Sequence, residues 1–210
     1  MRFPLRALVG LTALALAGTF LTTAPATAQT PTAAAAATYR GEGDDVVRIP
    51  ATTAATLVKA THSGERNFVV WALDSNGEKV DLVANVIGDY KGTKAFNTIT
   101  PRKVRTLEVS ADGAWTLQVL PMSKARYWAI NAKGNGSDVL KLTSPSKGMH
   151  RLTIRHSGER NFVIWALDNN GRAKRLLVNK IGDYKGRVVL PAGIRYATVE
   201  ADGSWSITRS

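Results

Sequence analysis

Cysteine is absent from all 210 residues of the chain, and histidine occurs only three times. Small secreted eukaryotic domains are usually dense in disulfides, so a cysteine-free chain must be held together by its core alone. The three histidines stand at no spacing typical of a zinc site. We therefore expect no disulfide, no bound metal and no other cofactor.

Long apolar runs are also lacking, apart from Ala7–Leu21 near the start of the chain. Fifteen residues are short for a bilayer-spanning helix, and two arginines precede the run. The small residues of Ala26-Thr27-Ala28 follow it and are typical of a cleavage site. The sequence thus predicts a secretory signal peptide over residues 1–28 and no membrane span in the mature chain from Gln29. An uncleaved membrane anchor is the alternative.

Beyond that segment no helical periodicity is found, but one long segment occurs twice. Residues 61–92 and 155–186 are identical at 22 of 32 positions, including the blocks HSGERNFV and IGDYKG. A duplicated unit of this size defines the architecture. We predict a flexible leader over residues 29–40, repeat 1 over 41–119, a connector over 120–133 and repeat 2 over 134–210.

Each repeat has the pattern of an all-β unit. Apolar residues alternate with polar ones around Leu107 and Val109, which is typical of a half-buried strand, and Phe68–Leu73 is a short apolar run typical of a central strand. Asp112-Gly113, matched by Asp202-Gly203, favours a hairpin turn. The expected fold class is all-β, with two tandem antiparallel β-sandwich repeats after the signal peptide.

Four blocks occur in both repeats, beginning in repeat 1 at Gly41, His62, Ile87 and Ala111. Together they resemble a tandem β-sandwich repeat of exported actinobacterial proteins, and the resemblance covers nearly the whole mature chain. It implies a secreted β-sandwich protein of a family whose function is largely unassigned. It implies no catalytic residues.

The block His62–Asn67, repeated as His156–Asn161, holds a base, a hydroxyl and a carboxylate. Adjacent residues of a strand point to opposite faces, so His62 and Ser63 are poorly placed for a Ser-His-Asp site. We interpret the block as a turn, with a ligand-binding loop as the alternative. Asp74 begins a segment similar to a calcium loop, but Asn85 occupies the position that requires a glutamate, which favours another turn.

The tryptophans fall into two kinds. Trp115 and Trp205 alternate with apolar residues and are predicted to lie in the core. Trp71 and Trp165 lie inside continuous apolar runs, so their strand face is ambiguous. They are either buried between the repeats or exposed as platforms on which sugars stack.

Charge is distributed unevenly, because residues 39–121 have a net charge of zero and residues 122–210 a net charge of +10. The candidate contacts for an anionic polymer are the four basic residues that repeat 2 gains within the duplicated segment: Arg172, Lys174, Arg175 and Lys180. Their counterparts in repeat 1 are Glu78, Val80, Asp81 and Val86. A solvated basic face is the other interpretation. No known nucleic-acid-binding motif is present, so no sequence-specific nucleic acid is expected.

These observations predict a secreted, non-enzymatic binding protein of the cell envelope or the extracellular matrix, associated with the cell wall. Its expected partner is a polysaccharide or an anionic polymer, contacted through Trp71, Trp165 and the basic residues of repeat 2. A secreted protein-binding factor such as a protease inhibitor is the first alternative. A hydrolase is the second.

Overall fold

A computed structural model describes residues 36–210 of the chain. They all belong to one unit. The predicted signal peptide and residues 29–35 of the predicted leader lie outside the described residues. Within 36–210 no helix has the length and hydropathy needed to cross a bilayer.

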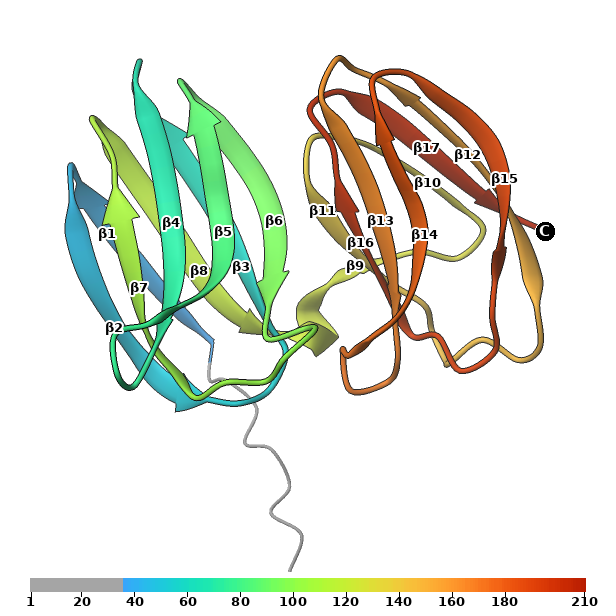
Figure 1. Cartoon of the computed structure of the whole chain (residues 1–210), viewed down its shortest axis with the longest axis horizontal. Helices are drawn as coiled ribbons and strands as arrows, with labels where there is room; N and C mark the ends of the chain where they lie inside the picture. The colour runs from blue at the N-terminus through green and yellow to red at the C-terminus, as the bar shows by residue number, and fades with distance from the viewer. Residues whose placement is uncertain (1–35) are drawn as a thin grey trace, which may run out of the picture. The chain divides into compact units, whose positions relative to one another are not determined.

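The first sandwich is built from eight strands in two four-stranded antiparallel sheets (Figure 1). The sheets have the orders β1-β8-β3-β6 and β2-β7-β4-β5. The strands are β1 (Ala37–Glu42), β2 (Asp45–Thr52), β3 (Thr56–Ser63), β4 (Asn67–Asp74), β5 (Lys79–Ile87), β6 (Tyr90–Phe96), β7 (Val104–Ser110) and β8 (Ala114–Pro121).

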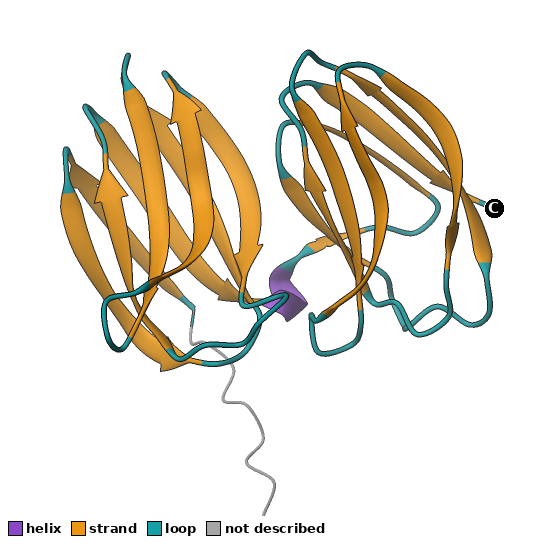
Figure 2. Ribbon diagram, viewed as in Figure 1, coloured by secondary structure: helices purple, strands orange, loops and turns teal. Residues whose placement is uncertain are grey.

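The second sandwich repeats this topology with the strand orders β10-β17-β12-β15 and β14-β13-β16-β11-β9. A 3-10 turn, Met122–Lys124, leads into it and is the one helical element of the described residues (Figure 2). The strands are β9 (Arg126–Tyr127), β10 (Asn131–Asn135), β11 (Asp138–Lys141), β12 (His150–Ser157), β13 (Asn161–Leu167), β14 (Ala173–Ile181), β15 (Tyr184–Leu190), β16 (Tyr196–Glu200) and β17 (Ser204–Arg209). Among the described strands only β9 pairs in parallel, with β11. The predicted all-β fold is therefore confirmed.

Alternation along the strands produces one apolar core in each sandwich. Phe68, Val70 and Ala72 of β4 are fully buried, as is Phe162 of β13. Both core tryptophans are confirmed, since Trp115 and Trp205 are each only 3% exposed. Their indole N–H groups donate to the carbonyls of Gly43 and Gly136.

The predicted hairpin at Asp112-Gly113 is wrong. Strand β7 belongs to one sheet and β8 to the other, so Asp112-Gly113 crosses between the sheets, and Asp202-Gly203 does the same between β16 and β17. A type I′ hairpin turn needs positive φ at both central residues, and neither Gly113 nor Gly203 has it. Strand alternation reveals which face of a strand is buried but not which strand it pairs with.

The strands extend beyond the predicted repeat boundaries. Strand β1 begins at Ala37, inside the predicted leader, and β10 begins at Asn131, inside the predicted connector. The connector also contributes Trp128, which is 1% exposed in the second core. Much of the predicted connector is thus part of the second sandwich.

A third apolar cluster joins the two sandwiches. Leu57 and Met122 pack there with Val139 and Leu167 of the second sandwich. Main-chain hydrogen bonds also cross the contact, from Thr93 N to Ser137 O at 3.0 Å and from Ala173 N to Thr98 O at 2.8 Å. One side of this contact is the outer face of the β1-β8-β3-β6 sheet, and the other is the β14-β13-β16-β11-β9 sheet.

Candidate functional site

The repeated polar block His62–Asn67 forms a connection between the two sheets of its sandwich. Its main-chain N–H groups are used internally, because Gly64 N donates to Asp89 Oδ1, and Glu65 N and Arg66 N both donate to Asp112 Oδ2. The same bonds recur in the second sandwich around Gly158, Asp183 and Asp202. The turn interpretation thus accounts for the main-chain N–H groups of Gly64, Glu65 and Arg66.

His62 itself is enclosed by protein. Its side chain has no exposed area, and its ring stacks on Phe68 with centroids 4.6 Å apart. Nδ1 lies 2.9 Å from the carbonyl oxygen of Gly88, so Nδ1 carries the proton and donates it, while Nε2 lies 3.4 Å from Asp112 Oδ1. His156 repeats this arrangement. The side chains of both histidines have no exposed area.

The acidic partners of these histidines have lowered pKa values. The N–H of Glu65 is the main cause for Asp112, and it outweighs burial, which raises that pKa. For Asp202 burial raises the pKa most, but the N–H groups of Glu159 and Arg160 together bring it below its usual range. These carboxylates stabilise the connections between the sheets.

The calcium-like segment at Asp74 is also a turn. Asp74 Oδ1 accepts hydrogen bonds from the N–H groups of Asn76 and Glu78, and Oδ2 pairs with the guanidinium of Arg102 at 2.5 Å. Residues 36–210 contain no cluster of three or more metal-ligating side chains. The carboxylate oxygens are occupied by the chain itself.

Trp71 and Trp165 are half-buried and do not share one environment. The ring of Trp71 is on the outer face of β4, and the ammonium of Lys79 lies 5.0 Å from its centroid. Trp165 instead packs in the apolar cluster between the sandwiches, beside Ala95. In the second sandwich Ala173 stands at the position of Lys79. The first sandwich covers the outer face of β13 there. Trp165 therefore has the position of the first alternative, between the repeats, and Trp71 does not.

Arg172 is also part of the contact between the sandwiches. Its guanidinium donates to the carbonyl oxygens of Asn97 and of Thr53, the latter at 2.8 Å. Lys174 pairs with Asp168 at 3.3 Å, and Arg175 and Lys180 are exposed on β14. Of the four predicted basic contacts, only Arg175 and Lys180 are therefore exposed without a carboxylate partner among the described residues.

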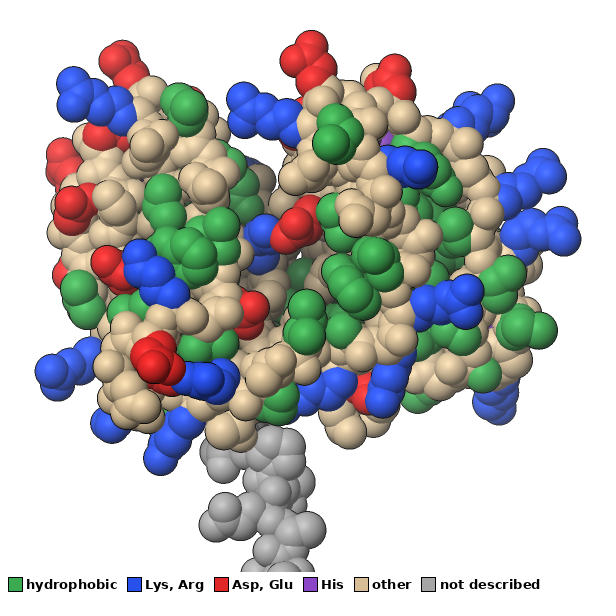
Figure 3. All heavy atoms as spheres, in the orientation of Figure 1, with side chains coloured by type: hydrophobic (Ala, Val, Ile, Leu, Met, Phe, Trp, Pro, Cys, Tyr) green, Lys and Arg blue, Asp and Glu red, His purple; other side chains and the backbone are tan. Residues whose placement is uncertain are grey.

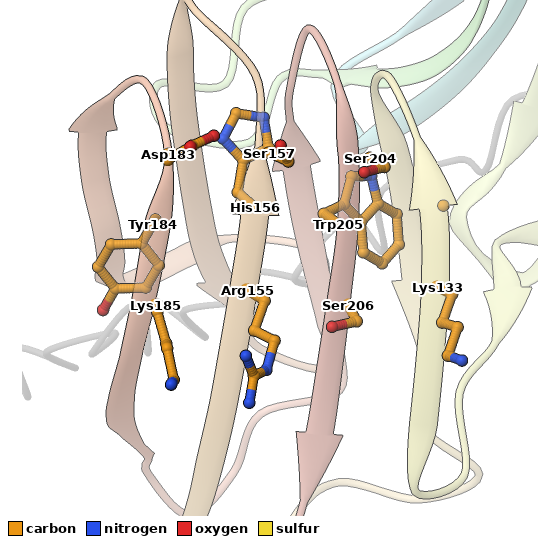
Figure 4. A pocket seen from close by; sticks show the side chains of 11 residues that line it. Lys133, Arg155, His156, Ser157, Asp183, Tyr184, Lys185, Ser204, Trp205 and Ser206 are labelled. Atoms are coloured by element: carbon orange, nitrogen blue, oxygen red, sulfur yellow. The ribbon is translucent and has the colours of Figure 1, made fainter.

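A different basic surface lies on the outer face of the sheet β10-β17-β12-β15. We call it the basic face and define it by Lys133, Arg151, Arg155, Lys185 and Arg187. Figure 4 shows Arg155 and Lys185 on neighbouring strands, and in the register of β12 and β15 they stand directly opposite each other. Arg187 is opposite Thr153, and Lys133 is opposite Ser206 on the edge strand.

A shallow depression of about 790 Å³ marks this face. Ser157, Ser204 and Ser206 line it together with Lys133, Arg155 and Lys185. None of the five basic side chains of the face forms an ion pair with a described residue. Lysine and arginine side chains also project from much of the second sandwich in the view of Figure 3.

The sequence contains a signal for this face that a comparison of charges between the two copies of the duplicated segment does not reveal. In the segment 151–157 the buried residues Leu152, Ile154 and His156 alternate with Arg151 and Arg155, so the arginines had to share the opposite face. Lys185 and Arg187 alternate in the same way on β15. That these two strands are neighbours follows only from the structure.

Comparison with protein-family models and with curated proteins gives no match to this chain.

Proposed function

We propose that the protein is a secreted, non-enzymatic binding protein that attaches to an anionic polymer of the cell envelope or the extracellular matrix. The basic face of the second sandwich is the attachment surface. The resemblance to repeats of exported actinobacterial proteins fits this location, and a cell-wall polysaccharide bearing phosphate or carboxylate groups is the expected partner class.

The observation that carries the proposal is the direct opposition of Arg155 and Lys185 across β12 and β15. Like charges opposite each other destabilise a sheet. No described carboxylate forms an ion pair with Arg155 or Lys185, and Asp183, which lines the same depression, accepts from Gly158 N. In the first sandwich the equivalent pair is Thr61 and Lys91, which carries one charge. The additional charge of Arg155 lowers the stability of the free protein. An external anion that binds between Arg155 and Lys185 explains why the charge is present.

The surroundings of the pair suit a hydroxylated, extended ligand. Serine and threonine side chains share the face with the cations and can donate to or accept from sugar hydroxyls. Because the depression is open, it can follow a chain instead of enclosing one small molecule. Arg175 and Lys180 are exposed on β14, an edge strand of the other sheet, and are not part of the basic face.

Sedimentation with isolated bacterial cell walls across a salt series tests the proposal. We expect retention of the protein at low salt and its release as salt rises, because attraction between exposed charges is screened. The double variant Arg155→Thr, Lys185→Gln should lose most of this retention. A matched control, Arg48→Thr with Arg105→Gln, removes two exposed charges from the first sandwich and should retain it.

Equal retention of the two double variants would refute the basic face as the attachment surface. Retention of the wild type that does not respond to salt would refute an anionic partner.

Protein binding is a second candidate, favoured by the outer face of β4 in the first sandwich. In the second sandwich the equivalent face is covered by the first sandwich. In the first sandwich this face is open, and Val46, two strands from Trp71 with Glu108 between them, is 62% exposed. An exposed aromatic side chain bordered by charged groups, here Lys79 and Glu108, is typical of a protein contact. If the protein binds a protein partner through this face, Trp71→Ala abolishes binding of that partner and leaves cell-wall sedimentation unaffected.

A further inference from the structure

A groove of about 460 Å³ lies between the two sandwiches, on the face of the first sandwich that corresponds to the basic face of the second. Its floor consists of outward-pointing side chains of β3, β6 and β8, among them Lys59, Lys91 and Gln118. One wall is formed by Arg126, Asn135 and Asp138 of the second sandwich. The duplicated face is thus open in the second sandwich and walled in the first.

The free charge of the groove is positive. Lys59 and Lys91 form no ion pair with any described residue. Asp138, the only carboxylate among the lining residues, is neutralised by Arg126, whose Nε lies 2.7 Å from Oδ2. An incoming ligand therefore meets two unpaired ammonium groups.

The two lysines are placed to share one anionic group. Lys59 is opposite Thr93 and Lys91 is opposite Thr61, so the lysines are diagonal neighbours across the antiparallel pair. Such neighbours are about 7 Å apart, a separation that long side chains bridge. A single carboxylate or phosphate between them can accept from both ammonium groups.

The other lining groups suit a polyol. Thr61, Thr93, Gln118 and Asn135 point into the groove, and their side chains form no hydrogen bond with any described residue. Amide and hydroxyl groups of this kind both donate and accept, as the hydroxyls of a sugar require. The volume is in the range of small-molecule sites, which begins at about 300 Å³.

From this combination we propose that the groove is a second binding site, which takes one sugar residue carrying an anionic group. The lysine pair holds the carboxylate or phosphate, and Gln118, Asn135 and the threonines hold the hydroxyls. The site is distinct from the basic face, because it has a wall on its second side and accepts a compact unit instead of an extended chain.

An NMR titration of the whole protein with three probes tests the site. Glucuronate supplies a carboxylate, glucose 6-phosphate supplies a phosphate, and glucose supplies neither. We expect at least one of the acidic sugars to bind with a Kd of about 1 mM or lower and to shift the amides of Lys91, Thr93 and Asn135. Glucose should bind at least tenfold more weakly, and the stronger acidic probe identifies the anionic group.

Matched variants separate this site from the basic face. Lys59→Gln with Lys91→Gln keeps the side-chain stems and removes both charges, so the affinity for the acidic sugar should fall at least tenfold while the thermal transition stays unchanged. Lys185→Gln alters the counterpart of Lys91 on the basic face and should leave this affinity as it is. The groove double variant should still sediment with cell walls.

Three results would each overturn the proposal. They are equal binding of glucose and the acidic sugars, undiminished binding by the groove double variant, and amide shifts confined to the strands of the basic face. Failure of cell-wall sedimentation by the wild type would refute the proposed function but would leave this titration valid, so the two failures can be told apart.

Discussion

The guanidinium of Arg172 in the second sandwich donates a hydrogen bond to the main-chain carbonyl oxygen of Asn97 in the first. Asn97 is fully buried and is the one described non-glycine residue with positive φ, 59°. Its side-chain amide donates to the carbonyl of Arg102 at 2.9 Å, which fixes the loop that presents the acceptor. The charge gained at position 172 therefore serves the contact between the sandwiches and is not free for a ligand.

Removal of this contact should loosen the two sandwiches. For Arg172→Ala we expect a loss of about 2 kcal/mol in the free energy of unfolding, since hydrogen bonds from charged groups contribute about 1.5–3 kcal/mol and two carbonyls lose their donor. Urea unfolding measures the loss. Arg175→Ala, three residues along and exposed, should change stability by less than about 0.5 kcal/mol. Equal effects of the two variants would contradict the role given to Arg172.

Trp165 and Trp71 should differ although they are duplicates. Trp165→Ala is expected to cost about 2 kcal/mol more than Trp71→Ala, because the Trp165 ring packs in the cluster between the sandwiches. Chemical denaturation of the two variants tests the difference. A larger loss for Trp71→Ala would show that the outer face of β4 in the first sandwich is not an open surface.

The proposed binding pair should make the free protein less stable. Arg155→Thr restores the residue of the first sandwich and removes the opposed like charges, so we expect a gain of about 0.2–1 kcal/mol at low salt. The gain should shrink as salt screens the repulsion. Thermal unfolding at two ionic strengths measures it, and a loss of stability at low salt would show that Arg155 has a structural partner.

Alkaline stability should depend on Tyr90. Burial raises the pKa of its hydroxyl to about 12, opposed by a hydrogen bond with Ser137 and assisted by the charge of Glu200. The unfolded side chain ionises near 10.0, so this contribution is intact below that pH and is lost as pH rises toward 12. The difference between the folded and unfolded pKa values corresponds to about 2.7 kcal/mol.

Tyr90→Phe keeps the ring and cannot ionise, so it isolates this effect. Urea unfolding of wild type and variant between pH 9 and 12 should show the wild type losing stability relative to the variant. Parallel curves over this range would contradict the burial of the hydroxyl.

Acid stability should depend on Asp112. Because its folded pKa is lowered from the usual 3.8 mainly by the N–H of Glu65, the stabilisation is present above that pH and is lost as pH falls below it. Asp112→Asn should be less stable than the wild type near neutral pH, and the difference should shrink in acid. Denaturation at several pH values measures both, and a difference that is constant with pH would show that the charge of Asp112 is unimportant.

Much of the architecture could be predicted from residue order alone. The duplication from His62 and from His156 fixed two equivalent units, and alternation along the strands placed Trp115 and Trp205 in the cores. These features are local, since strand periodicity and sequence identity do not depend on what lies opposite in space.

Only the tertiary structure decided strand partners and the surfaces that follow from them. Asp112-Gly113 has the composition of a hairpin turn, yet it crosses between the sheets. There its carboxylate accepts from the N–H groups of Glu65 and Arg66, which are far away in the sequence. Arg172 differs from Glu78 because its surroundings belong to the other sandwich. Arg155 and Lys185 become a pair only when β12 and β15 are neighbours, since long-range pairing, not composition, sets which charges meet.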